Sequence, residues 1–145
     1  MVDSHRETEL RQAIEELYFG YRAFTALPDQ ILAERGLGRT HHRILYFVRR
    51  DPGISIGELL AVLSVTKQAL HRPIRDLEQQ DLLFIATDLQ DRRVRRLSVT
   101  LAGAELEGRL TASQMRLLDD AFDGLDDSAR EHWHQVMRRL AQGVG

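Results

Sequence analysis

The chain has 145 residues, with 20 Lys and Arg against 22 Asp and Glu, so its formal net charge is −2. This length and the 43% share of hydrophobic residues predict one globular domain and exclude a disordered or fibrous chain. Because the chain contains no cysteine, disulfides, cysteine nucleophiles and thiol-based redox switches are excluded.

The first part of the chain is expected to form two helices. Apolar side chains recur at helical spacing from Leu10 to Phe24 and predict an amphipathic helix of about five turns. We expect this helix to end near Leu27, because Pro28 favours a break and can open a second, short helix over residues 29–35.

Capping residues mark the next two helices. Thr40 is the expected N-cap of a helix over residues 41–50, which an Asp-Pro-Gly sequence then ends. Ser55 and Glu58 form a capping box, in which the hydroxyl and the carboxylate each accept a hydrogen bond from a backbone N–H group. The capping box predicts a short helix over residues 56–63.

The short helix, a tight turn at residues 64–66 and a longer helix to about Gln80 have the arrangement of a helix-turn-helix. Thr66 is the expected N-cap of the longer helix. Its apolar face, expected to lie in the core, consists of Leu70, Pro73, Ile74 and Leu77. Its opposite, polar face consists of Gln68, His71, Arg72 and Arg75, led by Thr66 and Lys67.

The polar face suits a helix that reads DNA. A helix N-terminus with hydroxyl and ammonium groups favours a phosphate, and Gln and Arg side chains can reach base edges in a major groove. A solvated amphipathic helix would show a similar polar stripe. This stripe, however, contains no acidic residue before Asp76 and follows the spacing of a helix-turn-helix.

A small β-hairpin is predicted after the helix-turn-helix. Residues 83–87 and 94–99 favour two strands around a polar loop. The arginines at and just beyond this loop are Arg92, Arg93, Arg95 and Arg96. The hairpin would project as a wing, and either of the first two arginines could enter a minor groove. Alternatively, Asp88 and Asp91 pair with these arginines and hold the turn.

Two more helices complete the prediction. Thr100 can cap a long helix over residues 101–122, and Asp126 or Asp127 can cap a last helix with an apolar stripe. The elements together predict a mainly α-helical protein with one small β-hairpin.

The net charge conceals an uneven distribution along the chain. Residues 39–96 contain 11 Lys and Arg and 7 Asp and Glu, a net charge of +4, whereas residues 1–38 and residues 97–145 each have −3. Of the 20 basic residues, 19 are Arg, whose planar guanidinium suits phosphates and guanine edges. A basic centre is therefore available for DNA despite the acidic average.

Residues 88–103 resemble the wing signature of the MarR-type winged helix-turn-helix regulators. They read Asp-Leu-Gln-Asp-Arg-Arg, then an alternating strand, then a Thr that opens the next helix. Residues 77–82 are similar to the end of the family's recognition helix, except that Asp81 stands where Gly is usual. Pro73 is a second departure, since it removes a backbone hydrogen bond and is expected to kink the helix. The resemblance extends over almost the whole chain.

The resemblance implies a winged helix-turn-helix flanked by dimerisation helices, in a single domain of residues 1–145. Residues 39–100 would form the DNA-binding lobe, and residues 1–38 and 101–145 the dimerisation helices. A homodimer is expected to bind a pseudo-palindromic operator, with recognition helices in major grooves about 10 bp apart. Family members usually repress transcription until a small aromatic or anionic effector releases them from DNA.

Two sets of candidate site residues follow. The predicted DNA-binding residues are Ser64, Thr66, Lys67, Gln68, His71, Arg72, Arg75, Arg92 and Arg93. The predicted effector-binding residues are Tyr18, Tyr21, Arg22, His41, His42 and Tyr46. Alternatively, these aromatic side chains belong to the core or a dimer interface, and the histidines cap a helix.

Other classes of protein fit the sequence less well. An enzyme would need a nucleophile or an acid–base set, and the chain has no Gly-rich phosphate loop, Gly-x-Ser-x-Gly or His-Glu-x-x-His motif. No catalytic residue, metal ligand or cofactor is expected, although a zinc site built across helices stays open. A winged-helix module that binds proteins would usually lack the basic stripe and the wing arginines.

The lengths of the apolar runs indicate where in the cell the protein is expected. The longest have five residues, too few to cross a bilayer, and the polar N-terminus is unlike a secretory signal. We therefore expect a cytoplasmic protein with DNA, a second copy of itself and a small effector as partners, and no membrane.

Overall fold

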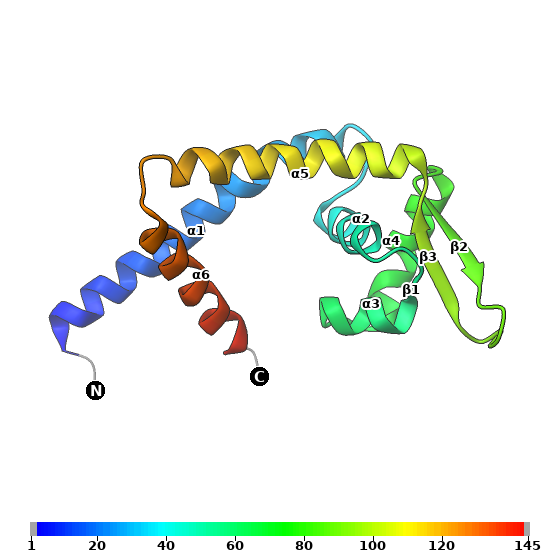
Figure 1. The fold of residues 1–145 in the computed structure, drawn as a ribbon, viewed down its shortest axis with the longest axis horizontal. Helices are drawn as coiled ribbons and strands as arrows, with labels where there is room; N and C mark the ends of the chain where they lie inside the picture. The colour runs from blue at the N-terminus through cyan, green and yellow to red at the C-terminus, as the bar shows by residue number, and fades with distance from the viewer. Residues whose placement is uncertain (1–2, 144–145) are drawn as a thin grey trace. The chain divides into compact units, whose positions relative to one another are not determined.

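The computed structural model describes residues 3–143, and Figure 1 shows the order of the helices and strands. The chain divides into two compact units, one ending at Gln114 and the other beginning at Met115. Within residues 3–143, no helix is both long and apolar enough to cross a membrane. The fold is mainly helical with one small antiparallel sheet, as the sequence predicts.

Helix α1, Ser4–Ala33, continues through Pro28, so the expected break after Leu27 and the separate short helix are wrong. Proline has a φ angle that suits a helix but lacks an N–H group, and its place in α1 leaves the carbonyl of Phe24 without its helical donor. That carbonyl instead accepts a hydrogen bond from Nε2 of Gln114, at 3.4 Å. A tertiary contact therefore compensates for the missing backbone hydrogen bond.

Helix α2, Arg39–Arg50, begins two residues earlier than expected. Its N-cap is Gly38, and Thr40 lies inside the first turn, so the prediction of Thr40 as the cap is wrong. His41 explains the difference, because its Nδ1 atom accepts a hydrogen bond from the Gly38 N–H group at 2.9 Å. The imidazole takes the part that a glutamate takes in a capping box.

Helices α3, Ile56–Leu63, and α4, Lys67–Gln79, form the predicted helix-turn-helix. The capping box of α3 is confirmed: the Ser55 hydroxyl accepts from the Glu58 N–H group at 3.0 Å, and the Glu58 carboxylate accepts from the Ser55 N–H group at 3.1 Å. Thr66 is the N-cap of α4, as expected.

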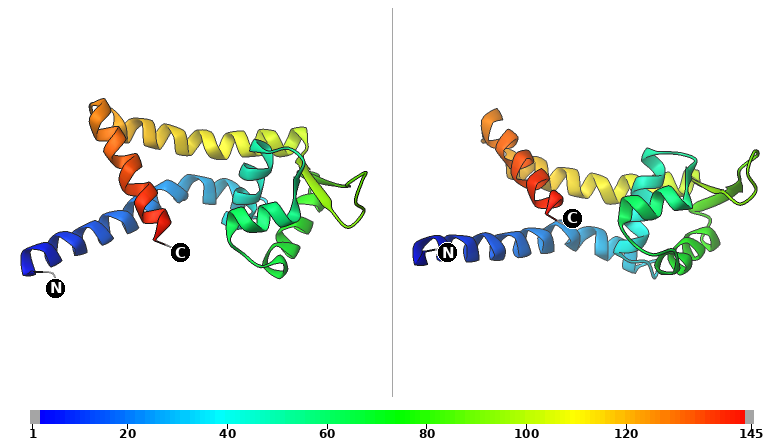
Figure 2. Two further views of the ribbon diagram at one scale, coloured as in Figure 1. Left: turned by 60° about the horizontal axis from the view of Figure 1, so that its bottom comes forward. Right: turned by 90° about the horizontal axis from the view of Figure 1, so that it is seen from below.

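Three strands form the sheet, in the order β1-β3-β2: β1 is Ile54–Ser55, β2 is Leu83–Thr87 and β3 is Arg95–Val99. The hairpin of β2 and β3 confirms the predicted ribbon and projects beyond the helices as a wing (Figures 1 and 2). Strand β1 was not expected, because two residues give no detectable period. It pairs with β3 through Ile54 and Leu97, both of which are buried.

Helix α5, Leu101–Phe122, has the predicted bounds. The Thr100 hydroxyl accepts from the Gly103 N–H group at 3.0 Å and donates to the carbonyl of Asp81 at 2.6 Å. Asp81 has a φ of 59°, a left-handed conformation that glycine adopts most easily and aspartate tolerates. This conformation explains why glycine is usual at that position in the family that the sequence resembles.

The core of the first unit is formed mainly by leucine and isoleucine side chains. Its fully buried members include Leu32, Ile44, Leu45, Leu59, Leu70, Leu77, Leu82, Leu97, Leu106 and Leu110. The predicted apolar face of α4 is confirmed at Leu70, Ile74 and Leu77, whereas Pro73 is half-buried. This core fixes α4 with its polar face outward.

The second unit contains the end of α5 and helix α6, Asp127–Gln142. Of the two predicted caps, Asp126 is the N-cap and accepts a hydrogen bond from the Ala129 N–H group at 2.8 Å. Trp133 packs edge-on against Phe122, with ring centres 5.3 Å apart. In the described part of the chain, no α6 side chain is buried.

Candidate nucleic-acid interface

The side chains predicted to contact DNA lie on the turn before α4, on α4 itself and on the loop of the wing. All of them are exposed: Ser64, Thr66, Lys67, Gln68, His71, Arg72, Arg75, Arg92 and Arg93. On α4, Gln68, His71, Arg72 and Arg75 lie opposite the buried leucine and isoleucine side chains, and Lys67 lies in the first turn. The fold therefore leaves every predicted contact residue accessible.

The N-terminus of α4 presents free backbone donors. The Thr66 hydroxyl accepts a hydrogen bond from the Ala69 N–H group at 3.2 Å. Within residues 3–143, the N–H groups of Lys67 and Gln68 have no acceptor. Two free N–H groups, the positive end of the helix dipole and a lysine ammonium make this end of α4 a place where a phosphate is stabilised.

The polar face of α4 carries no acid before Asp76, and Asp76 is paired. Oδ2 of Asp76 lies 2.9 Å from Nε2 of His41 in α2, and Oδ1 lies 3.8 Å from Nε of Arg72, one turn earlier. His71 and Arg75, beside them, line the same shallow hollow on this face. The negative charge of Asp76 is thus balanced by its neighbours. Pro73 does not interrupt the helix that carries these side chains, since α4 is continuous from Lys67 to Gln79.

Two aspartates hold the turn of the wing. Oδ2 of Asp88 accepts hydrogen bonds from the N–H groups of Gln90, at 3.0 Å, and Asp91, at 2.9 Å. The guanidinium of Arg96 beside Asp88 and these N–H groups hold the pKa of the Asp88 carboxyl below its usual range. The Arg93 guanidinium lowers the pKa of Asp91 in the same way. Both carboxylates are therefore structural parts of the loop.

Two of the four wing arginines are engaged in ion pairs and two are free. Arg93 pairs with Asp91 at 3.1 Å, and Arg96 pairs with Asp88 at 2.7 Å. Among residues 3–143, Arg92 and the neighbouring Arg95 form no ion pair. Pairing of wing arginines with the two aspartates is therefore observed, and it leaves other wing arginines available for DNA. Of the two predicted minor-groove arginines, Arg92 is the one whose charge is uncompensated.

Arg96 also joins the wing to the helix-turn-helix. Its Nη1 atom donates to the carbonyl of Gly53 at 3.0 Å and lies 3.8 Å from the carboxylate of Glu58, in the first turn of α3. Backbone and side-chain hydrogen bonds from Ser55, with a smaller contribution from Arg96, lower the pKa of Glu58. The contact fixes the wing relative to the helices that carry the predicted DNA-binding residues.

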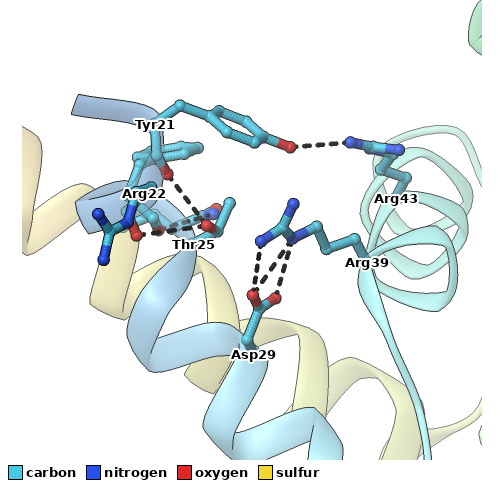
Figure 3. A network of polar contacts seen from close by, with 8 residues as sticks. Tyr21, Arg22, Thr25, Asp29, Arg39 and Arg43 are labelled. Carbon is cyan, nitrogen blue, oxygen red and sulfur yellow. Dashed lines mark hydrogen bonds and ion pairs between the residues drawn. The ribbon is translucent and has the colours of Figure 1, made fainter. Parts of the chain in front are cut away.

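The predicted effector residues do not gather around one pocket. Tyr21 in α1 accepts a hydrogen bond from Nη2 of Arg43 in α2, at 3.0 Å, whereas Arg22 points away from these residues (Figure 3). The Arg22 guanidinium lies 5.9 Å from the ring centre of Tyr18. Tyr46 contacts Phe47 and Arg50 instead. Only Tyr21 of this set takes part in the polar network between α1 and α2.

Three members of that network were missed from the sequence. Asp29 in α1 accepts hydrogen bonds from both Nε and Nη2 of Arg39 in α2, and the Arg39 guanidinium lies 5.4 Å from the ring centre of Tyr21 (Figure 3). Arg39 and Arg43 are four residues apart and so share one face of α2. That spacing is the signal that could have found them. The network joins the long first helix to α2.

The two adjacent histidines have different surroundings. His41 forms the hydrogen bonds to Gly38 and Asp76 already described, so the alternative that a histidine caps a helix is confirmed for it. His42 is buried, and this desolvation lowers its pKa below the ordinary value of 6.5. Near it lies the buried carboxylate of Glu107, which pairs with Arg49 at 2.8 Å and accepts from Thr111. In the part of the chain described, no three His, Asp or Glu side chains gather to hold a metal ion.

An exposed basic helix with a capped N-terminus, followed by a basic wing on a three-stranded sheet, defines a winged helix-turn-helix DNA-binding protein. The sequence is 37% identical over 134 residues to the HTH-type transcriptional regulator PetP of Rhodobacter capsulatus, covering 92% of this chain and 81% of that protein. The sequence profile of the MarR family matches residues 35–94. The chain belongs to the MarR family and is a DNA-binding transcriptional regulator, not an enzyme.

Solved structures share the fold. The crystal structure of the MarR family transcription regulator SP03579 has a TM-score of 0.80 and 21% identity, covering 97% of this chain and 93% of that one. Streptococcus pneumoniae FabT in complex with DNA has a TM-score of 0.79 and 16% identity, covering 93% of this chain and 96% of that one. The winged helical fold predicted from the sequence is thus found in both.

Proposed function

We propose that this regulator binds a pseudo-palindromic operator as a homodimer in the cytoplasm and represses transcription until a small effector releases it. The observation that supports DNA binding is the polar face of α4, which is exposed from Thr66 to Arg75 and contains no acidic residue over that range. Lys67 and the free N–H groups beside it contact a phosphate. Gln68 and His71 read base edges in the major groove.

The remaining predicted contacts have supporting roles. Ser64 and Thr66 reach the backbone from the turn before α4, and Arg72 and Arg75 extend the contact along the groove. Arg92, exposed at the loop of the wing and without an ion pair in the described chain, enters the minor groove, where Arg is attracted by the negative potential. Arg93 contacts DNA while it shares its charge with Asp91.

Exposed apolar side chains support the homodimer. Those on α1 are Leu10, Ile14, Leu17, Tyr18, Phe19, Tyr21 and Leu27, and those on α6 are Trp133, Val136 and Leu140. Apolar stripes of this kind on a soluble regulator mark an interface. Sedimentation should give twice the chain mass of 16.7 kDa, and Ile14→Glu should give a monomer, whereas the control Gln12→Glu on the same helix should not.

The α1–α2 network supports the effector proposal. Arg39, Arg43 and Tyr21 place two guanidinium groups and an aromatic ring on one surface, which suits an aromatic anion. An anion that displaces Asp29 from Arg39 would loosen the link between α1 and the DNA-binding lobe. A screen of aromatic acids for release of bound duplex tests this, with Arg43→Ala expected to lose the response.

Selection of bound duplexes from a random pool is the experiment that tests DNA reading. The selected duplex should contain two related half-sites, and its affinity should fall linearly with log salt. Gln68→Ala should relax the preference at one base pair of each half-site, whereas Gln30→Ala on α1 should change nothing. If no duplex binds at ~50 mM salt, or if affinity is independent of salt, the proposed operator binding is wrong.

A further inference from the structure

The side chain of His41 connects the first turn of α2 with the middle of α4. Its Nδ1 atom accepts a hydrogen bond from the Gly38 N–H group at 2.9 Å, and its Nε2 atom lies 2.9 Å from Oδ2 of Asp76. A backbone N–H always donates, so Nδ1 carries no proton and the Nε2–H group donates to the carboxylate. The His41 side chain is only 13% exposed and that of Asp76 30%. The two hydrogen bonds hold the imidazole ring at both of its nitrogen atoms.

This contact is a directional one in the middle of α4, whereas the C-cap residue Gln80 donates a hydrogen bond from its side chain to the carbonyl of Arg35 at 3.0 Å. Leu70, Ile74 and Leu77 attach α4 to the core through apolar packing, which is not directional. Pro73 has no N–H group, so α4 also lacks one backbone hydrogen bond in its middle. Within residues 3–143, the bond from His41 to Asp76 is the hydrogen bond that joins a side chain of Lys67–Gln79 to another element.

We propose that His41 is a positioning residue for base reading. The apolar core turns the polar face of α4 outward, and the bond from His41 to Asp76 limits the remaining rotation of α4 about its own axis. It thereby sets the direction in which Gln68 and His71 approach the base edges. This inference rests on the proposal that α4 reads bases. Hydrogen bonds to base edges tolerate little displacement, whereas long basic side chains follow phosphates over a wider range. Loss of the contact should therefore lower sequence selectivity and leave the electrostatic part of binding unchanged.

Two substitutions separate the two hydrogen bonds of the ring. In His41→Asn, Oδ1 takes the place of Nδ1 and can accept from Gly38, but the side chain is too short to reach Asp76. In His41→Gln, Nε2 can take the place of the imidazole Nε2 and donate to Asp76, but no acceptor remains beside Gly38. A purely structural role of His41 would make the variant without the cap the more damaging one for every property.

The measurement is the ratio of affinities for the duplex selected by the wild type and for a scrambled duplex, at several salt concentrations. His41→Asn should lower this ratio about tenfold, the effect of one weakened base contact, with the salt slope and melting temperature near those of the wild type. His41→Gln should keep the ratio within about twofold and melt at a lower temperature. The role is disproved if His41→Asn keeps the wild-type ratio.

Substitutions of Asp76, the hydrogen-bond partner of His41, test the same role if a His41 variant folds poorly. Asp76→Asn retains an acceptor for Nε2–H and should keep the ratio, whereas Asp76→Ala should lower it as His41→Asn does. The double variant His41→Asn/Asp76→Ala should be no worse than either single variant, and additive losses would contradict the inference. If the wild type itself selects no sequence, base reading by α4 fails as well. If Gln68→Ala relaxes selectivity but the His41 and Asp76 variants do not, only the positioning role fails.

Discussion

The side-chain amide of Gln114 in α5 donates a hydrogen bond to the carbonyl oxygen of Phe24 in α1, at 3.4 Å. This carbonyl is the one that Pro28, four residues later, leaves without a helical donor. We expect Gln114→Met, which keeps the shape of the side chain but removes the donor, to lower the free energy of unfolding by about 0.5–1.5 kcal/mol. Urea denaturation at a fixed protein concentration measures this change.

Pro28→Ala provides the control for this prediction. Alanine restores the N–H group at position 28, which can donate to Phe24, so the side chain of Gln114 becomes dispensable there. In the Pro28→Ala background the effect of Gln114→Met should fall to a few tenths of a kcal/mol. An equal loss in both backgrounds would show that Gln114 stabilises the chain in another way.

This contact also shows why part of the fold could not be predicted. Gln114 and Phe24 are 90 residues apart. The residues around Pro28 therefore show that the proline removes a helical hydrogen bond, but not that a distant side chain replaces it. The bounds of α3 and α5 were predictable because Ser55 and Thr100 form their capping hydrogen bonds within three residues. Local hydrogen bonds are visible in a sequence, and distant ones are not.

The candidate site also contains residues that could be predicted from local sequence patterns and residues that could not. The exposed face of α4 follows from helical periodicity, so Gln68 and His71 could be predicted. The network of Asp29 and Arg39 could not, since it depends on where α1 lies against α2. Likewise the sequence left open which wing arginines are paired, because Arg96 is eight residues from Asp88.

Arg92 and Arg93 should differ in their contribution to DNA binding. Arg92→Ala removes a charge that forms no ion pair within residues 3–143, and we expect it to weaken all duplexes and to reduce the slope of log affinity against log salt by about one. Arg93→Ala should reduce the slope less, because Asp91 already balances part of that charge. Arg109→Ala on α5, which removes an equal charge from an exposed position, is the control and should leave the slope unchanged. A larger effect for Arg93 than for Arg92 would contradict this assignment.

Gly103 is expected to tolerate no side chain. A Cβ atom at this position would lie 1.9 Å from the carbonyl oxygen of Leu82, so α5 would have to move away from the sheet and from the hydrogen bond of Thr100 to Asp81. Gly103→Ala should therefore lower the free energy of unfolding by about 2–3 kcal/mol. Gly57→Ala in α3, where the nearest atom lies 3.9 Å away, should be neutral or stabilise by up to about 1 kcal/mol. Equal unfolding curves for the two variants would refute the close approach.

His42 should make stability depend on pH. Burial is the main cause that lowers its pKa, Arg43 lowers it further, and Glu107 and Asp29 oppose the change. Because the pKa in the folded chain lies below the ordinary value of 6.5, the unfolded chain binds the proton more readily. The contribution of neutral His42 to stability is thus present above pH 6.5 and is lost as the pH falls through and below that value.

His42→Leu isolates this contribution, because leucine fills a similar volume and does not titrate. The difference in unfolding free energy between the wild type and the variant should be constant above pH 7 and change below about pH 6.5 in favour of the variant. Its slope should approach, and not exceed, about 1.4 kcal/mol per pH unit, the value for one proton. The other histidines are present in both proteins and cancel in the difference. A difference that stays constant from pH 7 to pH 5 would mean that His42 is protonated equally in the folded and unfolded chains.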